Sequence, residues 1–119
     1  MTTQQIADRL AELCQQGEFQ QAQKELYAAD VISVEPEDVP GFDRETKGAD
    51  AVLEKIRKFE SNVEESFGNK VSDPIVAGNS FAFTLDMDLK MKGQDRNTMS
   101  EICVYEVKDG KVTSERFYW

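Results

Sequence analysis

Apolar residues recur at helical spacing near the start of the chain. Thr2 and Gln5 form a capping-box pattern, which predicts a helix that begins after Thr2 and ends at Gly17. Its apolar face, at positions i, i+4, i+7 and i+8, comprises Ile6, Leu10, Leu13 and Cys14. A second helix follows almost without a loop, with an apolar face of Phe19, Ala22, Leu26 and Ala29. The two helices are therefore expected to form a tightly connected pair.

A short apolar run and a third helix follow. Residues 31–35 form a β run that Pro36 interrupts, because proline cannot donate a hydrogen bond to a ladder. Residues 37–41 are acidic and contain a second proline, which predicts a loop, and residues 42–47 are expected to be extended. Gly48 precedes a helix predicted over residues 49–59, whose apolar side comprises Val52, Leu53, Ile56 and Phe59.

The second half of the chain alternates apolar and polar residues with the period of two that strands show. A strand is predicted over residues 70–77, kinked or at a sheet edge because of Pro74. Strands over 80–91, 97–107 and 111–119 complete an antiparallel meander. Asp109 and Gly110 separate the last two strands and suit a two-residue hairpin turn, in which both positions need positive φ. Helices followed by a run of antiparallel strands predict an α+β fold.

Composition narrows the classes of function. The 119 residues suffice for one domain, and the formal net charge of −9 argues against a nucleic acid or a membrane as partner. No apolar run reaches the length of a membrane span, and the N-terminus lacks a signal-peptide pattern. Cys14 and Cys103 lie in different predicted elements, which indicates buried reduced thiols and a cytoplasmic location. The chain has no histidine, so the usual general base is absent, and no cofactor or metal site is expected.

Several short motifs occur in a characteristic order. They are Gly-Glu-Phe at 17–19, the segment 26–36 that ends in Ser-Val-Glu-Pro, and the segments 47–53, 76–84 and 104–112. In this order and spacing the chain resembles the nuclear transport factor 2-like superfamily, and most closely its SnoaL-like (polyketide cyclase or ketosteroid isomerase-like) group. The resemblance covers residues 1–119 as a single SnoaL-like domain. It implies a cone-shaped, curved antiparallel sheet wrapped by three N-terminal helices (a cystatin-like fold), an apolar pocket, and homodimers through the outer sheet face.

The resemblance also implies where chemistry would lie. Isomerases of this group carry a carboxylate base just before the proline that ends the first strand, and the matching residue here is Glu35. They also use a tyrosine on the first helix and a protonated aspartate on the penultimate strand. The matching residues here are about Leu10, and Cys103 with Glu101 two residues earlier. Neither Leu10 nor Cys103 replaces those donors, so the oxyanion hole of a ketosteroid isomerase is not expected.

Strand alternation places further polar residues on the face that would line a pocket. Glu101 and Tyr105 share one face of their strand and, with Glu35, are the catalytic candidates. The predicted pocket lining comprises Phe81, Phe83, Leu85, Cys103, Glu115, Phe117 and Trp119. If Glu101 and Glu115 share a cavity, their like charges push at least one carboxyl toward its neutral, proton-donating form. Alternatively, they pair with Arg96 or Arg116, or reach water at a strand end.

Each catalytic candidate also has a plain structural interpretation. Glu35 could remove a proton next to a carbonyl group, or it could belong to a solvated acidic strand end. Tyr105 could donate a hydrogen bond to a ligand carbonyl, or it could simply pack in the core. Cys103 fits a small buried residue better than a nucleophile, because no cation in the sequence is placed to activate it.

Three classes of function therefore stay open. One is an enzyme with isomerase- or cyclase-type acid–base chemistry on a small hydrophobic, carbonyl-containing molecule, and another is a binder of such a molecule without turnover. The third is a dimeric interaction module whose pocket is filled by its own side chains. Ile102, Val104, Arg116 and Tyr118 on the outer sheet face favour a homodimer.

Overall fold

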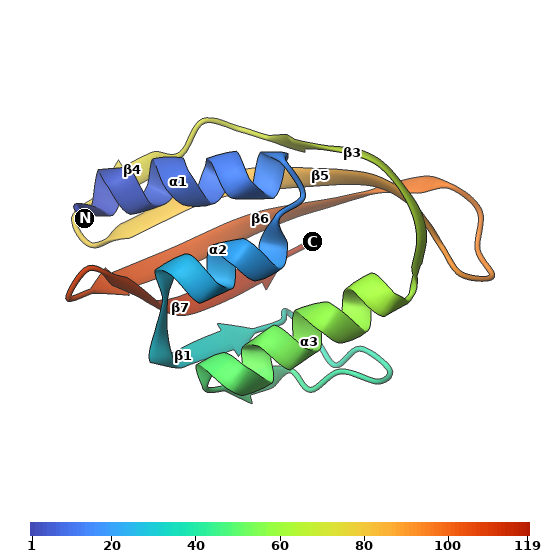
Figure 1. Ribbon diagram of the computed structural model, residues 1–119, viewed down its shortest axis with the longest axis horizontal. Coiled ribbons are helices and arrows are strands. Elements are labelled where there is room, and N and C mark those ends of the chain that lie inside the picture. The colour runs from blue at the N-terminus through green and yellow to red at the C-terminus, as the bar shows by residue number, and fades with distance from the viewer.

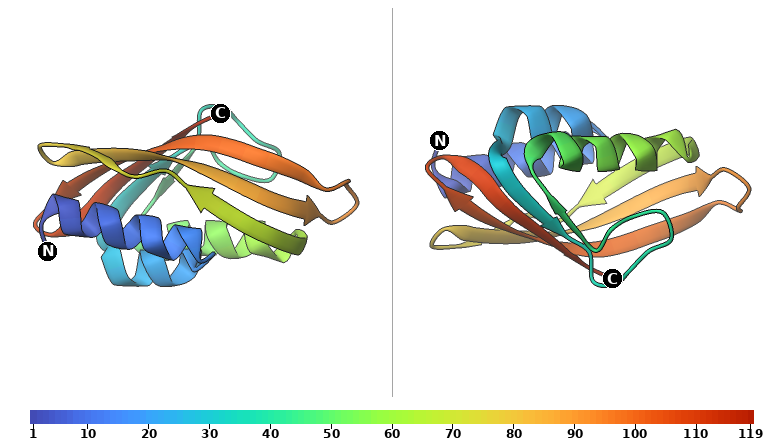
Figure 2. Two further views of the ribbon diagram at one scale, coloured as in Figure 1. Left: turned by 90° about the horizontal axis from the view of Figure 1, so that it is seen from above. Right: turned by 90° about the horizontal axis from the view of Figure 1, so that it is seen from below.

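Three helices cover one face of a curved sheet in the computed structural model, which describes residues 1–119 (Figure 1). The helices are α1 (Thr3–Gln15), α2 (Phe19–Leu26) and α3 (Ala49–Ser61). The strands are β1 (Tyr27–Val34), β2 (Glu45–Lys47), β3 (Val63–Val71), β4 (Ile75–Ala77), β5 (Ser80–Met91), β6 (Asn97–Lys108) and β7 (Lys111–Tyr118). Figure 2 shows the helices together on one side of the sheet, with the C-terminus beside the loop that joins β1 to β2. This is the expected α+β arrangement.

The sheet is mixed rather than wholly antiparallel. Its strand order is β2-β1-β7-β6-β5-β3, with β4 also paired to β5, and every pairing is antiparallel except that of β1 with β7. The expectation of an antiparallel sheet is therefore wrong for this one pair, because it followed the meander alone and did not place β1. The parallel pairing aligns Ser33 of β1 with Glu115 of β7. Two residues distant in sequence thereby meet in the interior.

Two element boundaries differ from those that the sequence predicts. The second helix ends at Leu26, because Tyr27 turns to extended backbone (φ −88°, ψ 140°) and starts β1. Ala29, expected on the apolar helix face, is therefore an exposed strand residue. The strand expected over 70–77 is two strands, since Pro74 falls in the gap between β3 and β4 and both pair with β5.

The local signals for the first helix and the last hairpin are confirmed. The Gln5 amide donates to the Thr2 hydroxyl at 3.1 Å, and the Thr2 amide donates to Gln5 Oε1 at 2.8 Å, which completes the capping box. Asp109 and Gly110 have φ of 53° and 75°, so both adopt the positive φ that the two-residue turn needs. The turn sets the register of β6 against β7 and hence the side chains that face inward.

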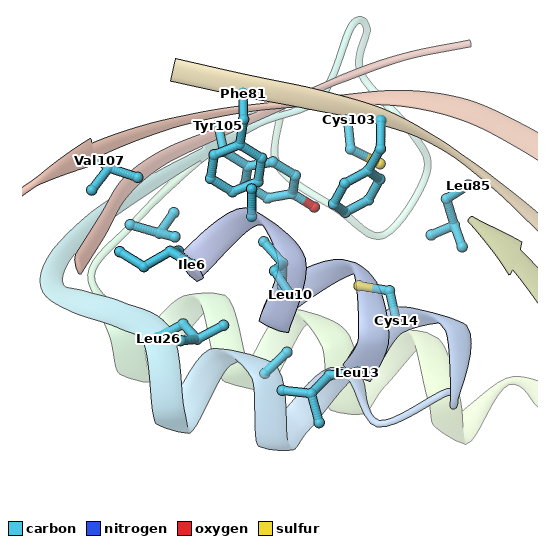
Figure 3. Packing of buried hydrophobic residues seen from close by; sticks show 14 of the residues in the cluster. Ile6, Leu10, Leu13, Cys14, Leu26, Phe81, Leu85, Cys103, Tyr105 and Val107 are labelled. Carbon is cyan, nitrogen blue, oxygen red and sulfur yellow. The ribbon is translucent and has the colours of Figure 1, made fainter. Parts of the chain in front are cut away.

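The core lies between the helices and the concave face of the sheet. Figure 3 shows Ile6 and Leu10 of α1 beneath the aromatic side chains of β5 and β6. The Phe81 and Tyr105 rings stack with centroids 4.9 Å apart, and the Phe83 ring lies 5.3 Å from Tyr105. None of the three helices combines the length and apolarity needed to cross a bilayer.

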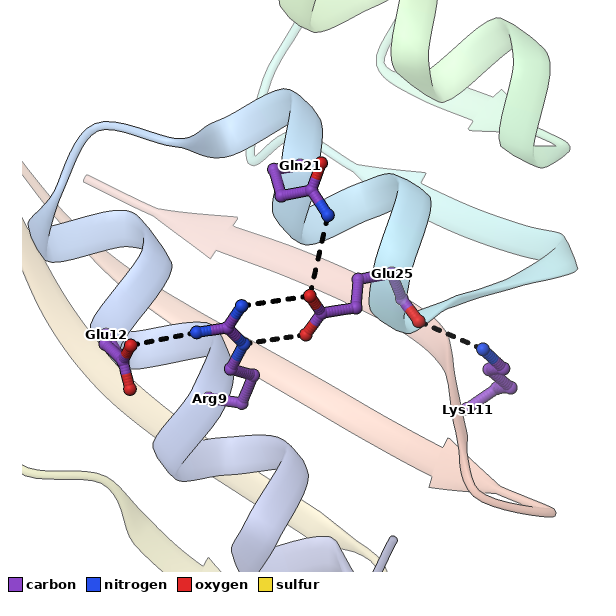
Figure 4. A network of polar contacts seen from close by, with 5 residues as sticks. All are labelled: Arg9, Glu12, Gln21, Glu25 and Lys111. Atoms are coloured by element: carbon purple, nitrogen blue, oxygen red, sulfur yellow. Dashed lines mark hydrogen bonds and ion pairs between the residues drawn. The ribbon is translucent and has the colours of Figure 1, made fainter.

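A polar network on the outside ties α1 to α2. The Arg9 guanidinium donates to both carboxylate oxygens of Glu25, at 2.7 and 3.0 Å, and also binds Glu12 (Figure 4). Lys111 Nζ, from the start of β7, donates to the Glu25 backbone oxygen at 3.0 Å. The Arg9 hydrogen bonds hold the pKa of Glu25 below its ordinary value. These contacts fix the position of α2, whose inner face forms part of the cavity described next.

Candidate functional site

An internal cavity of about 410 Å³ lies between the helices and the sheet. It is lined by 21 residues, of which 15 are hydrophobic, so most of its wall can only contact apolar groups. Its aromatic lining comprises Phe19, Tyr27, Phe42, Phe59, Tyr105, Phe117 and Trp119. The exposed lining residues are Met99, Ser100 and Trp119, which places the opening beside β6 and the end of β7.

A buried carboxylate, Glu115, lies in one wall of the cavity with only 3% of its surface exposed. The Tyr27 hydroxyl donates to its Oε1, and the Ser33 hydroxyl donates to its Oε2 at 2.5 Å. Burial raises the pKa of Glu115, whereas Lys55 and the two hydroxyl donors oppose that shift. Both oxygens of Glu115 therefore have donors from within the chain.

Lys55 extends this cluster from α3 to the end of β1. Its Nζ donates to the Ser33 hydroxyl at 2.5 Å and to Glu35 Oε1 at 2.8 Å. The Lys55 and Glu35 side chains are each only 13% exposed, so the ion pair is largely shielded from water. Because an ammonium group can only donate, Ser33 must accept from Lys55 and direct its own proton to Glu115. Lys55 is thus a donor to Glu35 on one side and to Ser33 on the other, and Glu115 accepts from both Ser33 and Tyr27.

Glu101 is the third carboxyl group of the cavity, and it has the weakest hydrogen-bond donor of the three. Its one side-chain hydrogen bond comes from the Cys103 thiol, at 3.5 Å, and a thiol is a weak donor. The pKa of Glu101 is raised to about 7, mainly by burial; the charges of Glu35 and Glu115 contribute to the rise, and Cys103 and Lys55 oppose it. At neutral pH this carboxyl therefore exchanges readily between its neutral and ionised forms. Such a group can give or take a proton without a change of pH.

The remaining ionisable groups near the cavity stay protonated. Burial raises the pKa of the Tyr105 hydroxyl well above its ordinary value. Burial also raises the pKa of the Cys103 thiol, and it raises that of Cys14 to about 12. Neither thiol is thus activated as a nucleophile.

The structure brings together most of the residues that the sequence singles out. Seven of them line the cavity: Glu35, Leu85, Glu101, Tyr105, Glu115, Phe117 and Trp119. Phe81, Phe83 and Cys103 do not, although they were expected in the lining. They are buried in the core instead, at 2%, 3% and 0% exposure, because α1 packs directly against that part of the sheet. The cavity lies further along β5 and β6.

The alternative pairing with arginine does not hold for either strand carboxyl, and access to water differs between them, since Glu115 is buried whereas Glu101 is half-buried. Arg96 binds Asp88 through two hydrogen bonds, at 2.9 and 3.0 Å, and Arg116 forms no ion pair with Glu101 or Glu115. A bulge does occur in β7, since Ser114 pairs with Glu106 and Val112 with Val107. Regular alternation would place Val112 and Glu115 on opposite faces of β7, but the bulge brings them to the same face, and both are buried.

Sequence reasoning missed Tyr27, Ser33 and Lys55. Tyr27 and Ser33 lie on β1, and their role depends on the parallel pairing of β1 with β7, for which the chain carries no local signal. Lys55 does not belong to the apolar side predicted for its helix, yet its long side chain reaches the cavity wall, and its Nζ lies 5.6 Å from the centre of the Phe117 ring. No group of three or more metal-ligating side chains lies close enough to hold a metal ion.

Comparison with known proteins gives one family and one fold. A family model described as the SnoaL-like domain matches residues 1–119. A crystal structure from Mesorhizobium loti, described as a candidate SnoaL-like polyketide cyclase and also as a carbohydrate phosphatase, is 35% identical. The match covers 100% of both chains with a TM-score of 0.91. No curated protein matches the chain.

More distant structures share the fold alone. An NTF2-like protein of unknown function from Burkholderia pseudomallei is 16% identical, with a TM-score of 0.83 over 100% of this chain and 92% of that one. TerC, co-crystallised with polyporic acid, is 13% identical, with a TM-score of 0.79 over 99% of this chain and 92% of that one. A protein from Xanthomonas campestris with a cystatin-like fold is 21% identical, with a TM-score of 0.83 over 99% and 90%. The predicted cone-shaped fold is thereby confirmed.

Proposed function

This chain belongs to the SnoaL-like domain family, and on that premise we propose that it binds a small, mostly apolar, carbonyl-containing molecule and performs acid–base chemistry on it. One observation carries the proposal: a largely apolar cavity of about 410 Å³ contains a carboxyl group, Glu101, whose pKa of about 7 lies at neutral pH. TerC, which has the same fold, was crystallised with a small molecule, polyporic acid. That agrees with a binding role for such a cavity.

The proposed roles follow from how well each polar group is already satisfied. Ionised Glu101 accepts a proton from the carbon next to the ligand carbonyl and returns it at another position. The Tyr105 hydroxyl, which lines the cavity, donates to the oxygen on which negative charge develops. Glu35 is held by Lys55, so its role is to position the lysine rather than to remove the proton.

Binding is tested first, by thermal shift on a panel of apolar carbonyl compounds, polyketide-like aromatic compounds, steroids and short-chain acids. A ligand at a hundred times its dissociation constant adds about 2.7 kcal/mol to the free energy of unfolding, which is easily detected. Glu106→Gln is a matched control, because Glu106 is an exposed carboxylate of the same strand. No stabilisation by any member of the panel argues against a ligand-binding function.

Proton transfer is tested next on a ligand that binds. In D₂O, NMR follows the loss of the proton next to the carbonyl group of the ligand. We expect exchange faster than in buffer with the wild type and with Glu106→Gln, and a loss of at least about a hundredfold in Glu101→Gln. Binding with exchange at the buffer rate would instead assign the protein to the class of binders without turnover.

We also propose that the outer face of the sheet forms a homodimer. Ile102 and Tyr118 are direct cross-strand neighbours on β6 and β7, and 49% and 50% of their surfaces are exposed. Trp119, next to Tyr118, is 57% exposed. An apolar group of this kind is typical of a contact between two copies. Light scattering at micromolar concentration should give twice the 13.5 kDa chain mass, and Ile102→Lys should give the monomer; a monomeric wild type contradicts the proposal.

A further inference from the structure

The three carboxyl groups of the cavity differ in their hydrogen-bond and ion-pair partners. Glu115 accepts from two hydroxyl groups, and Glu35 is paired with Lys55. Glu101 has only the Cys103 thiol. The cavity wall thus contains three carboxyl groups and one cationic group, the Lys55 ammonium, which is already paired with Glu35. When Glu101 is ionised, its negative charge has no counter-ion within the chain.

A second group in the same cavity lacks a partner. Gln23 of α2 lines the cavity, and its Oε1 is shut off from water without any hydrogen bond. It is the one buried side-chain oxygen or nitrogen in the chain in this condition. A buried acceptor without a donor costs about 1–3 kcal/mol, and few such groups persist in native proteins. A donor that arrives with a ligand would remove this cost.

The aromatic wall suits a cation. Seven aromatic side chains line the cavity, and the face of an aromatic ring attracts positive charge. Two of these rings already attract lysines of the chain: Lys55 Nζ lies 5.6 Å from the Phe117 ring centre, and Lys58 Nζ lies 4.8 Å from that of Phe42. The environment of Glu101 therefore combines an unpaired carboxyl with a wall that stabilises organic cations.

We propose that the ligand of this cavity carries a protonated amine, which forms an ion pair with the Glu101 carboxylate inside the aromatic wall. The inference rests on the proposed binding function and narrows its ligand class to apolar amines. Bound in this way, the ammonium supplies the counter-ion that the chain itself does not give to Glu101, and it keeps this carboxyl ionised in the complex.

Proton linkage gives the proposal a distinctive signature. The pKa of Glu101 is about 7, so about one molecule in eleven is ionised at pH 6 and about ten in eleven at pH 8. An ammonium that needs the ionised form should bind about tenfold more tightly at pH 8 than at pH 6. The ionisable groups that face Glu101 from the surrounding elements are Glu35, Lys55, Cys103, Glu115 and Cys14. Both cysteines stay protonated over this range, because burial raises their pKa.

Two probes of nearly equal shape provide the test: naphthylmethylamine, which stays protonated from pH 6 to pH 8, and the neutral naphthylmethanol. Calorimetry should show that the affinity of the amine rises about tenfold between these pH values, while that of the alcohol changes less than twofold. At pH 7, titrations in two buffers of different ionisation enthalpy should report release of about half a proton for each amine bound.

Two variants decide whether Glu101 is the partner. Glu101→Gln should remove the preference for the amine and its pH dependence, whereas Glu106→Gln should keep both. The inference is overturned if the alcohol binds as tightly as the amine at pH 8, or if the pH dependence persists in Glu101→Gln. The proposed binding function survives either result, since the cavity would still bind an apolar ligand. If neither probe binds the wild type, the inference is overturned, whereas the proposed binding function is decided separately by the thermal-shift panel of carbonyl compounds.

Discussion

The raised pKa of Glu101 predicts that the protein loses stability as the pH rises toward neutrality. The folded-state pKa is about 7 and the ordinary value is 4.5, so between these values the folded chain binds more protons than the unfolded chain. The free energy of unfolding therefore falls with rising pH across this window and levels off above it. At 1.36 kcal/mol for each pKa unit, Glu101 alone should lower the stability by about 3 kcal/mol between pH 4.5 and pH 8.

The perturbation that isolates this effect is Glu101→Gln, which keeps the shape of the side chain and removes the charge. Urea unfolding at pH 5, 6, 7 and 8 should show the variant close to the wild type at pH 5 and more stable by about 3 kcal/mol at pH 8. Glu115, whose pKa is also raised by burial, leaves a residual slope of the same sign in the variant. The exposed Glu106→Gln control should follow the wild type. A variant with the full wild-type slope, or one less stable at pH 8, would refute the reasoning.

Three further predictions concern the polar groups, each measured as the free energy of unfolding in urea at pH 7. Lys55→Met should lower the free energy of unfolding by about 3 kcal/mol, because it leaves Glu35 without its largely buried counter-ion. The double variant Lys55→Met/Glu35→Leu should recover most of this loss, and a double variant no more stable than Lys55→Met would contradict the explanation. Thr2→Ala should cost about 1 kcal/mol by removing the capping box, whereas Thr3→Ala, one residue inside the helix, should cost less. Gln23→Met should stabilise the ligand-free protein by about 1 kcal/mol, since it removes a buried acceptor without a donor, and a loss of stability would show that the amide has a partner.

Local signals in the sequence predict most of the elements but not how they meet. The Thr2–Gln5 capping box and the Asp109–Gly110 turn depend on residues within a few positions of each other, and both form as predicted. The end of α2 at Leu26 was misplaced, because Ala29 continues a helical period that pairing with the sheet overrides. The parallel alignment of β1 with β7 is a contact between segments that lie far apart in the sequence, and no local pattern encodes it.

For the candidate site, too, the sequence predicts what is local to one strand but not what depends on packing between elements. Strand parity was enough to bring Glu101, Tyr105 and Glu115 to one face, because alternation is a property of each strand by itself. It could not separate the cavity wall from the packed core, so Phe81 and Phe83, which share that face, were assigned to the pocket. Which of them faces empty space depends on where α1 rests on the sheet. That position is set by packing between elements rather than by any one of them.

The three carboxyl groups of the cavity would be equivalent if only their residue type and burial mattered. Their partners distinguish them: two hydroxyl donors for Glu115, an ammonium for Glu35, and a single thiol for Glu101. Hydrogen-bond donors favour the ionised form of a buried carboxyl and oppose the effect of burial, whereas a buried carboxyl without such donors is shifted toward its neutral form. The directed contacts from Lys55 through Ser33 to Glu115 use the donors of this cluster on two of the carboxylates. The proton, and with it the capacity for chemistry or for pairing with a cation, is therefore left to Glu101.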